Sequence, residues 1–264
     1  MTVWVVLPAF NEEANLPPLI HGLAETLRGA GIDYHIVVVD DGSEDGTRSA
    51  VAAHVGRLPV HLIVHLDNRG LARAIETGLR WTLSRCAPDD VIVTMDADNT
   101  HSPSLLPRMV AGIRGGSDLV IASRYARGGA EDGVSLLRRV LSRGIAALMR
   151  LRFRMQGVRD YSCGYRAYRA RLLLAAAAAY GPRLIEGRGF AVMAELLVKV
   201  RPFHPAIAEV PLRLRYGLKI GRSKMRVVRT IGEYLELLGK PAPSGSVGAE
   251  QSPVRKRSGQ RKPA

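Results

Sequence analysis

The sequence has few of the features that mark secreted or membrane-spanning proteins. Its 264 residues include only two cysteines, Cys86 and Cys163, so no disulfide framework is expected and a reducing, cytosolic setting is the default. No apolar run approaches the roughly 18 residues that a membrane-spanning helix needs. The stretch MTVWVVLPAFNEE has no basic region and no small-residue cleavage site, which argues against a signal peptide.

Two common phosphate-binding motifs are also missing. No G-x-G-x-x-G follows the first apolar run, and no G-x-x-x-x-G-K-[ST] occurs in the chain. The dinucleotide-binding and P-loop interpretations therefore lose their main support, and any nucleotide must be held by other residues. We predict a functional role for none of the seven histidines.

Charge is distributed unevenly along the chain. Residues 1–123 carry 9 Lys and Arg against 15 Asp and Glu, a net charge of −6, whereas residues 124–264 carry 29 against 9, a net charge of +20. An acidic first half suits a metal ion, and a basic second half suits phosphates or an anionic membrane. A solvated basic surface without a partner is the simpler alternative for the second half.

Apolar runs alternate with helix-like segments through the first half. The runs expected to form strands are 3–7, 34–39, 60–65, 91–95 and 118–122, and the expected helices are 12–29, 46–56, 70–85 and 103–115. Asn11 and Ser102, the latter followed by Pro103, are expected to cap two of these helices. The alternation predicts an α/β fold with a Rossmann-like, mainly parallel sheet flanked by helices.

The second half has a different pattern. Helices are expected at 134–153, 169–180, 189–200 and 224–238, and a strand at 207–215. Pro, Gly, Ser, Lys and Arg dominate from Gly239 onward, which predicts one domain over 1–238 and a disordered basic tail over 239–264. The helix at 134–153 interleaves apolar residues with arginines and is a candidate membrane-interface helix, with a solvated surface helix as the alternative.

Polar clusters stand where the expected strands end. PAFNEE follows the first strand, DDGSEDGT the second, DADNTHSP the fourth and SRYARGG the fifth. Ligands of parallel α/β sheets bind at the carboxyl ends of the strands. We therefore expect these clusters to share one site.

Two pairs of aspartates carry the chemistry of these clusters. Asp40 and Asp41 can accept hydrogen bonds from ribose hydroxyls or base N–H groups, with an ordinary Asp-Gly turn as the alternative. Asp96 and Asp98 can offer oxygen ligands to Mg²⁺ or Mn²⁺ while a substrate phosphate supplies others, and Thr100 can add a hydroxyl. A turn is again the alternative, but the position after a buried strand favours the metal.

Cations suited to phosphate follow in the second half. Arg124 stands at the end of the fifth strand and Arg138 near the start of the next helix, and guanidinium groups bind phosphate bidentately. Further along, LRYGLKIGRSKM places Arg215, Lys219 and Lys224 around glycines, which predicts a loop that binds an anion.

Seven motifs occur in a fixed order along the chain. Each motif alone is weak evidence for a protein family, but the ordered set is specific. PAFNEE, VVVDDGSEDGT, NRGLARAIETG, MDADNTHSP, ASRY, DYSCGYRAYR and AEVPLRLRYGLKIGRSKM occur in the order seen in family-2 glycosyltransferases. Over roughly residues 2–238 the sequence most closely resembles the dolichol- or polyprenol-phosphate mannosyltransferase group of that family. The resemblance implies a GT-A fold and the transfer, with inversion, of a hexose from GDP-mannose or a related nucleotide sugar to a polyprenyl or dolichyl phosphate.

The resemblance also assigns roles by motif. The implied contacts to the nucleotide sugar are Pro8, Phe10, Glu12, Val39, Asp41, Asp96, Ala97, Asp98, Lys219 and Ser223. The implied contacts to the acceptor phosphate are Arg124, Arg138, Ser142 and Arg215, and the implied ligands of Mg²⁺ or Mn²⁺ are Asp96, Asp98 and Thr100. Of these residues, Asp98, Arg124 and Arg138 are expected to be catalytic.

The expected reaction is a single displacement at the anomeric carbon. A phosphate acceptor is largely dianionic at pH 7 and needs no general base, whereas a sugar hydroxyl would need a carboxylate. The basic second half fits a phosphate acceptor at an anionic membrane surface on the cytoplasmic side. Two alternatives remain within enzymes, a UDP-sugar donor and a soluble acceptor. A basic nucleic-acid-binding protein is a distant third, because it leaves both aspartate pairs unexplained, and no nucleic-acid partner is expected.

Overall fold

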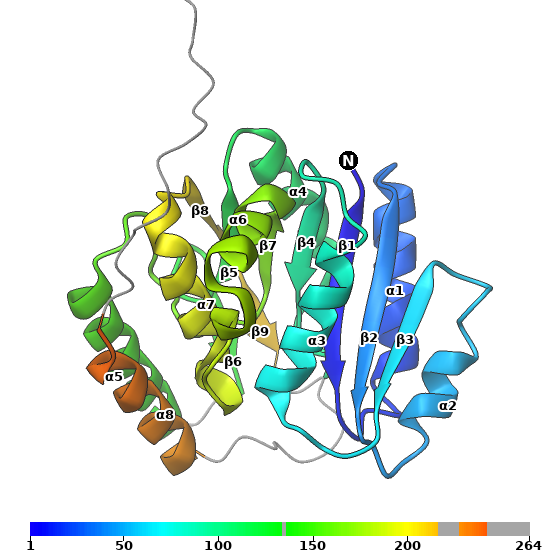
Figure 1. Cartoon of the computed structure of the whole chain (residues 1–264), viewed down its shortest axis with the longest axis horizontal. Coiled ribbons are helices and arrows are strands. Elements are labelled where there is room, and N and C mark those ends of the chain that lie inside the picture. Colours follow the sequence, from blue (N-terminus) through cyan, green and yellow to red (C-terminus); the bar gives the residue numbers. More distant parts are fainter. Residues whose placement is uncertain (134–135, 216–226, 242–264) are drawn as a thin grey trace, which may run out of the picture.

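The computed structural model describes residues 1–133, 136–215 and 227–241. Its centre is a seven-stranded sheet with the strand order β3-β2-β1-β4-β7-β5-β8, covered by helices on both faces (Figure 1). The strands of this sheet are β1 (Val3–Ala9), β2 (Tyr34–Asp41), β3 (Val60–His65), β4 (Val91–Thr94), β5 (Leu119–Ser123), β7 (Arg166–Arg169) and β8 (Ile207–Pro211). The five strands expected in the first half are thus confirmed, with bounds that differ by at most two residues.

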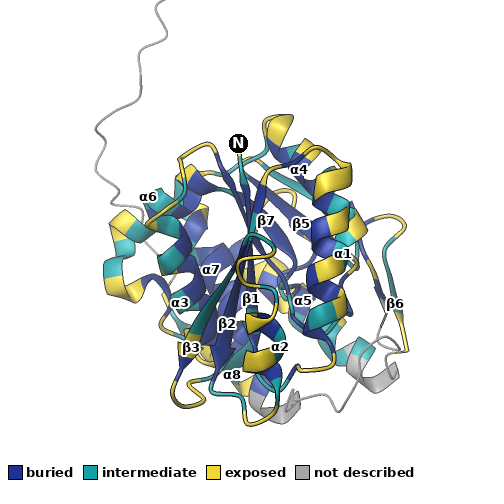
Figure 2. Cartoon of the chain, turned by 90° about the vertical axis from the view of Figure 1, so that its right-hand side faces the viewer, coloured by how far each residue is buried: buried dark blue, intermediate teal, exposed yellow. Residues whose placement is uncertain are grey.

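Strict alternation along the strands divides the core into two layers. In β1, Val3, Val5 and Leu7 belong to the hydrophobic cluster under α1 and α4, whereas Trp4 and Val6 belong to the cluster under α3, α6 and α7. The inner strands are therefore buried on both faces, as Figure 2 shows by its dark strands and yellow outer helix faces, whereas the edge strands β3 and β8 are partly exposed. The helices are α1 (Leu16–Gly29), α2 (Thr47–Ala52), α3 (Leu71–Leu83), α4 (Leu106–Arg114), α6 (Ala170–Tyr180) and α7 (Val192–Val200).

The first helix begins later than the sequence predicts. We expected it from residue 12 with Asn11 as its cap, but α1 begins at Leu16 and the cap position is Asn15. Asn11 has a positive φ of 51° and links two turns: its N–H donates to Ser43 Oγ (2.9 Å), and its side-chain oxygen accepts from the N–H of Glu44 (2.8 Å). The Asn11 prediction was therefore wrong, because this side chain bridges loops instead of capping a helix.

Strand β7 was not predicted. It runs antiparallel between β4 and β5, with Val93 and Val120 both paired to Ala167. Its sequence, RAYR, has no apolar run, and Arg166 is fully buried. Its guanidinium donates to the carbonyl oxygens of Tyr161 (2.7 Å) and Met193, which offsets the cost of burying a charged group.

The second half holds one further difference. The strand expected at 207–215 is two strands, since β8 pairs with β5 while β9 (Arg213–Arg215) pairs with β6 (Ala130–Asp132) in a separate two-stranded sheet. The expected helix at 134–153 is α5 (Leu136–Phe153), and the last expected helix is α8 (Val227–Gly239). These two helices lie side by side at one end of the sheet (Figure 1). The tail from residue 242 onward lies outside the described residues.

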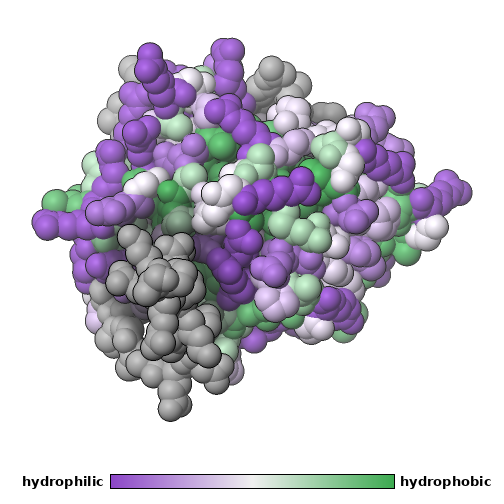
Figure 3. Space-filling model, turned by 90° about the horizontal axis from the view of Figure 1, so that it is seen from above, coloured by the Kyte–Doolittle hydropathy of each residue, from purple (hydrophilic) through white to green (hydrophobic). Residues whose placement is uncertain are grey.

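The surface is mixed in character, and the two cysteines are unpaired, as expected. Seen from the side where β1 begins, hydrophilic and hydrophobic side chains are interspersed (Figure 3). Cys86 and Cys163 are both free thiols. Within the described ranges, no helix combines the length and the apolar character that crossing a bilayer requires.

Helix α3 approaches the sheet closely at Gly78. A Cβ at this position would lie 2.5 Å from Cγ1 of Val6 and 3.1 Å from Cγ2 of Val39. Gly144 in α5 offers a contrast, because nothing lies within 4 Å of the Cβ that alanine would add there.

We predict that Gly78→Ala and Gly144→Ala have opposite effects on stability. The first change gains helix propensity but overpacks the layer between α3 and β1, so the free energy of unfolding should fall by about 1–2 kcal/mol. Gly144→Ala gains helix propensity without a clash and should raise the free energy of unfolding by up to about 1 kcal/mol. Urea unfolding of both variants is the measurement, and an unchanged or higher free energy of unfolding in Gly78→Ala would contradict the close approach of α3.

Candidate active site

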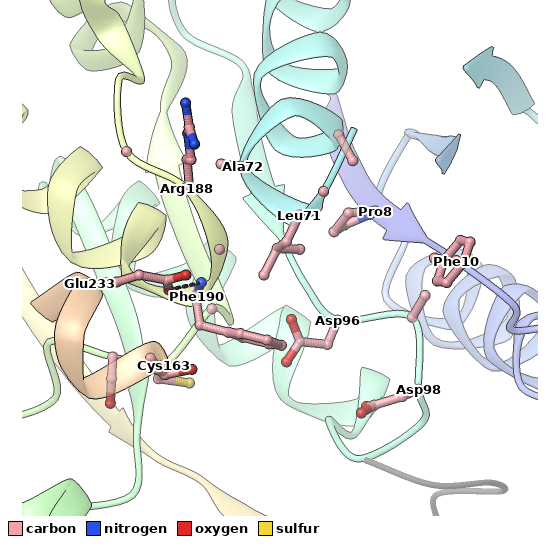
Figure 4. Close-up of a pocket in the computed structure, with 18 of the residues that line it drawn as sticks. Pro8, Phe10, Leu71, Ala72, Asp96, Asp98, Cys163, Arg188, Phe190 and Glu233 are labelled. Atoms are coloured by element: carbon pink, nitrogen blue, oxygen red, sulfur yellow. Dashed lines mark hydrogen bonds between the residues drawn. The ribbon is translucent and has the colours of Figure 1, made fainter. Parts of the chain in front are cut away.

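A cleft of about 1020 Å³ opens at the carboxyl ends of β1, β2 and β4. Most of the residues that were predicted to have a role line this cleft. The predicted residues that line it are Pro8, Phe10, Glu12, Asp41, Asp96, Ala97, Asp98, Thr100, Arg124 and Ser142. Figure 4 shows Pro8 and Phe10 on one side of this cleft and the two aspartates beside them on the loop after β4.

The aspartate pair consists of one oriented carboxylate and one accessible carboxylate. Oδ1 of Asp98 accepts hydrogen bonds from the hydroxyl of Thr100 (2.6 Å) and from its backbone N–H (3.2 Å). Asp96 has a side chain that is 44% exposed, with Nδ1 of the buried His101 at 3.9 Å from its carboxylate. Thr100 is buried and orients Asp98, and its role as a metal ligand stays a prediction.

Asp96 and Asp98 fit a divalent metal ion whose remaining ligands come from a substrate. Mg²⁺ usually binds through one or two carboxylates together with substrate phosphates and water. Among the described residues, no group of three or more His, Cys, Asp or Glu side chains is placed to hold a metal ion. Asp96 and Asp98 supply hard oxygens of the kind that Mg²⁺ and Mn²⁺ prefer, and a diphosphate would have to supply more.

At the other end of the cleft, Asp41 fixes the turn that precedes α3. Its carboxylate accepts from the N–H groups of Arg69 (3.0 Å) and Gly70 (2.7 Å) and lies 2.6 Å from Nδ1 of His65. Next to it, Gly42 has φ +69°, and a Cβ there would lie 2.5 Å from the backbone nitrogen of Asn68. Asp41 therefore shapes this end of the cleft, and its contact to a ribose stays a prediction.

Of two other predicted nucleotide contacts, Glu12 lines the cleft and Val39 does not. Glu12 lines the cleft and accepts a hydrogen bond from Nδ2 of Asn15 at 2.7 Å. Val39 does not reach the cleft, because its side chain is fully buried within β2 and faces α3 near Gly78. Any contact of Val39 with a base would have to come from its backbone.

Arg124 lines the cleft but is bound into a network of acidic side chains. Asp160 receives hydrogen bonds from Nε and Nη2 of Arg124, each at 2.8 Å, and Glu131 receives one from Nη1 at 3.1 Å. A second N–H of Nη2 donates to Ser162 Oγ at 2.6 Å. These four bonds use four of the five N–H groups of a guanidinium, which leaves one for a phosphate.

The pKa values of this pair follow from its burial and its contacts. Burial by itself would lower the pKa of Arg124, but the charge and hydrogen bonds of Asp160 raise it well above the ordinary value. Burial would raise the pKa of Asp160, and the charge and hydrogen bonds of Arg124 lower it instead. The two groups therefore stay ionised together, and Arg124 with Asp160 and Glu131 forms a cluster without net positive charge.

The remaining predicted acceptor contacts are only partly described. Ser142 in α5 lines the cleft, and its Oγ lies 2.8 Å from the hydroxyl of Tyr125. Arg138 belongs to α5 and Arg215 to β9, but their side chains lie outside the described part of the chain. Lys219 and Ser223 fall within 216–226, which is not described.

The cleft also contains residues to which the sequence analysis assigned no role. They come from the turn before α3, from the loop before α7, and from α8, and include Asn68, Arg69, Leu71, Arg188, Phe190 and Glu233. His101 lines it too, stacked on Tyr165 with 5.2 Å between ring centroids. A possible signal was the glycine-flanked stretch EGRGF, because paired glycines permit close backbone approaches.

Comparison with known proteins agrees with this geometry. The model of Glycosyl transferase family 2 matches residues 4–175. A dolichol-phosphate mannosyltransferase of Pyrococcus furiosus is 31% identical over 242 residues, which cover 89% of this chain and 62% of that protein. The chain thus spans less than two thirds of the length of this relative.

Two bacterial relatives match over more of their own length. An undecaprenyl-phosphate mannosyltransferase of Micrococcus luteus is 33% identical, with 85% of this chain and 88% of that protein covered. A polyprenol monophosphomannose synthase of Mycolicibacterium smegmatis is 34% identical, with 84% and 80% covered.

Solved structures establish the fold. Glucosyl-3-phosphoglycerate synthase of Mycobacterium tuberculosis, crystallised with Mn²⁺ and UDP-glucose, has a TM-score of 0.64 and 23% identity, with 91% of this chain and 80% of that chain covered. The same enzyme with Mn²⁺, UDP and phosphoglyceric acid has a TM-score of 0.63. The GT-A fold expected from the motifs is confirmed. With the family model matched from residue 4 to residue 175 and relatives above 30% identity, the chain belongs to glycosyl transferase family 2.

Proposed function

We propose that the protein is a metal-dependent, inverting glycosyltransferase that moves mannose from GDP-mannose to a polyprenyl or dolichyl phosphate. The observation that carries the proposal is one cleft that is lined by Asp96 and Asp98 together with Pro8 and Phe10, and by Arg124 and Ser142 as well. The names of the relatives from three organisms support the mannosyl and polyprenyl-phosphate parts of the proposal.

Asp96 and Asp98 are the proposed holders of Mg²⁺ or Mn²⁺. When bound, the metal would neutralise negative charge on the departing diphosphate. Structures of the same fold with Mn²⁺ or Mg²⁺ and UDP support this assignment. Thr100 contributes by fixing the orientation of Asp98 through its two hydrogen bonds.

The proposed reaction is one displacement. An oxygen of the acceptor phosphate forms a bond to the anomeric carbon while the bond to the diphosphate oxygen breaks, and the nucleoside diphosphate leaves with the electron pair. A phosphomonoester is largely dianionic at pH 7, so the step needs positioning and no general base. The remaining N–H of Arg124, the hydroxyl of Ser142, and Arg138 and Arg215 are the proposed contacts to the acceptor phosphate.

Helices α5 and α8 are the proposed contact with the membrane. Large apolar side chains are exposed on both: Leu148 (48%) and Leu151 (67%) on α5, and Leu235 (55%) on α8. Exposed arginines at 143, 150 and 152 accompany them on α5. Apolar side chains beside basic ones suit an anionic bilayer surface, and we place the enzyme at the cytoplasmic face of a membrane.

The donor and the acceptor are tested together by product formation. The protein is incubated with labelled GDP-mannose, UDP-glucose or UDP-N-acetylglucosamine, each with polyprenyl phosphate or with phosphoglyceric acid. We expect labelled lipid from GDP-mannose. If labelled lipid forms only from a UDP-sugar, the donor is that UDP-sugar and GDP-mannose is excluded. If only a soluble product forms, the acceptor is a soluble molecule and polyprenyl phosphate is excluded.

We predict that Asp98→Ala and Asp98→Asn each lower kcat at least about a hundredfold with any donor, because charge on the leaving diphosphate is no longer neutralised. Asp89→Asn is the matched control: Asp89 is 80% exposed and is not among the residues that line the cleft. Initial rates of transfer at saturating Mn²⁺ are the measurement. Near wild-type turnover of either Asp98 variant would refute the metal assignment.

We predict that Leu148→Asp combined with Leu151→Asp weakens binding to anionic vesicles about tenfold or more, since two apolar contacts are replaced by like charges. Cosedimentation is measured with residues 242–264 removed, so that the basic tail does not contribute. Val55→Asp, at another exposed apolar position (47%), is the control and should not change binding. Equal binding by all variants would exclude this surface of α5.

A further inference from the structure

The wall of the cleft that faces α3 is a short loop of sequence EGRGF, which begins at Glu186 and ends at Phe190. At its start, the carboxylate of the buried Glu195 in α7 accepts from the N–H groups of Glu186 (2.9 Å) and Gly187 (2.8 Å). At its end, the carboxylate of Glu233 in α8 accepts from the N–H of Phe190 (3.0 Å). The loop is therefore held at both ends by carboxylates from two different helices.

Two glycines permit this close hold. A Cβ on Gly187 would lie 2.7 Å from Oε2 of Glu195. Gly189 has φ +66°, and a Cβ there would collide with the carboxylate of Glu233. The path of the loop is thus determined by backbone contacts, which fix the position from which the side chain of Phe190 leaves the loop.

The ring of Phe190 points into the cleft. Figure 4 shows it extending from its anchored backbone toward the side chain of Asp96, with Glu233 behind it. On the strand side the cleft is kept open by Gly164, where a Cβ would lie 3.2 Å from Oδ1 of Asp96. An aromatic face and an accessible carboxylate therefore border the same space.

The position of the space between Phe190 and Asp96 indicates which part of the substrates would occupy it. On the proposed function, the diphosphate lies at Asp96 and Asp98, and the acceptor phosphate approaches from the wall of Arg124 and Ser142. The transferred hexose must lie between the two. A hexose presents hydroxyls that a carboxylate can accept from, and an apolar C–H face that an aromatic ring can cover.

We propose that Phe190 and Asp96 form the subsite for the transferred hexose, and that Glu233 is the positioning residue that holds Phe190 in it. The inference rests on the proposed function, because it takes a nucleotide sugar as the ligand. It adds a consequence for α8: the same helix that exposes Leu235 on its outer side anchors a wall of the sugar site on its inner side.

Binding without acceptor tests the ring directly. Calorimetric titration with Mn²⁺ compares GDP-mannose with GDP, and UDP-glucose with UDP, for the wild type, Phe190→Leu and Phe190→Ala. We expect Kd for the sugar nucleotide to rise about tenfold in Phe190→Ala and less in Phe190→Leu, while Kd for the nucleoside diphosphate changes less than about twofold. A merely structural role would weaken both ligands equally.

Variants of Glu233 test the positioning role. Glu233→Ala removes the acceptor of the Phe190 N–H and should give the same selective loss as Phe190→Ala. Glu233→Gln keeps an oxygen at this position and should restore most of the affinity for the sugar nucleotide. Glu236→Ala is the control on the same helix, since Glu236 is 72% exposed and pairs with Lys240 at 3.6 Å.

Three results would overturn the inference. An unchanged ratio of the two Kd values in Phe190→Ala would remove the ring from the hexose subsite. A rise only in KM for the polyprenyl phosphate would assign the ring to the acceptor. Equal weakening of both nucleotides would leave the ring a structural role alone. Failure of the proposed function is distinct, since the wild type would then bind none of these sugar nucleotides.

Discussion

The cleft depends on carboxylates that accept hydrogen bonds from backbone N–H groups. Asp41 holds the turn before α3 in this way, and Asp160 holds Arg124 and the segment at Cys163. Glu195 and Glu233 hold the EGRGF loop. Hydrogen bonds to an ionised acceptor are stronger than neutral ones, and a loop without regular structure otherwise leaves its N–H groups to water. Acidic residues thus build the site before any of them meets a substrate.

This use of acidic residues changes how the basic half of the chain is understood. The net charge of +20 over residues 124–264 suggested that its arginines face phosphates. Instead, most of the N–H groups of Arg124 donate hydrogen bonds to Asp160 and Glu131. Nε of Arg139 also lies 3.9 Å from Oε2 of Glu131. Arg166 is buried against carbonyl oxygens. The net charge of a segment therefore does not show where its unpaired arginines lie, because Arg124 at the cleft is already paired with acidic side chains of the same segment.

The sequence was sufficient for the order of strands and helices through the first half of the chain and for the expectation that its polar clusters meet at one edge of the sheet. Continuous apolar strands are a strong signal, and polar clusters after them mark the carboxyl edge of a parallel sheet. The aspartates of the DADNT stretch were found in this way. What the sequence did not disclose depends on tertiary partners. RAYR carries no strand pattern because the burial of Arg166 is made tolerable by carbonyls on other segments. Asn11 has the composition of a cap, yet its partners lie on the neighbouring turn after β2.

The antiparallel strand β7 also has a consequence for the order of folding. Strands β4 and β5 follow one another along the chain, but in the sheet β7 separates them, and β7 begins only at Arg166. The first 123 residues therefore cannot complete their own sheet as they leave the ribosome. Until β7 is inserted, β4 and β5 each present an open edge of unpaired backbone groups, which is the kind of surface that mispairs with other chains. Insertion of β7 closes the gap between β4 and β5, and the other edge of β5 stays open until β8 pairs with it, so the growing chain loses its open strand edges in two steps.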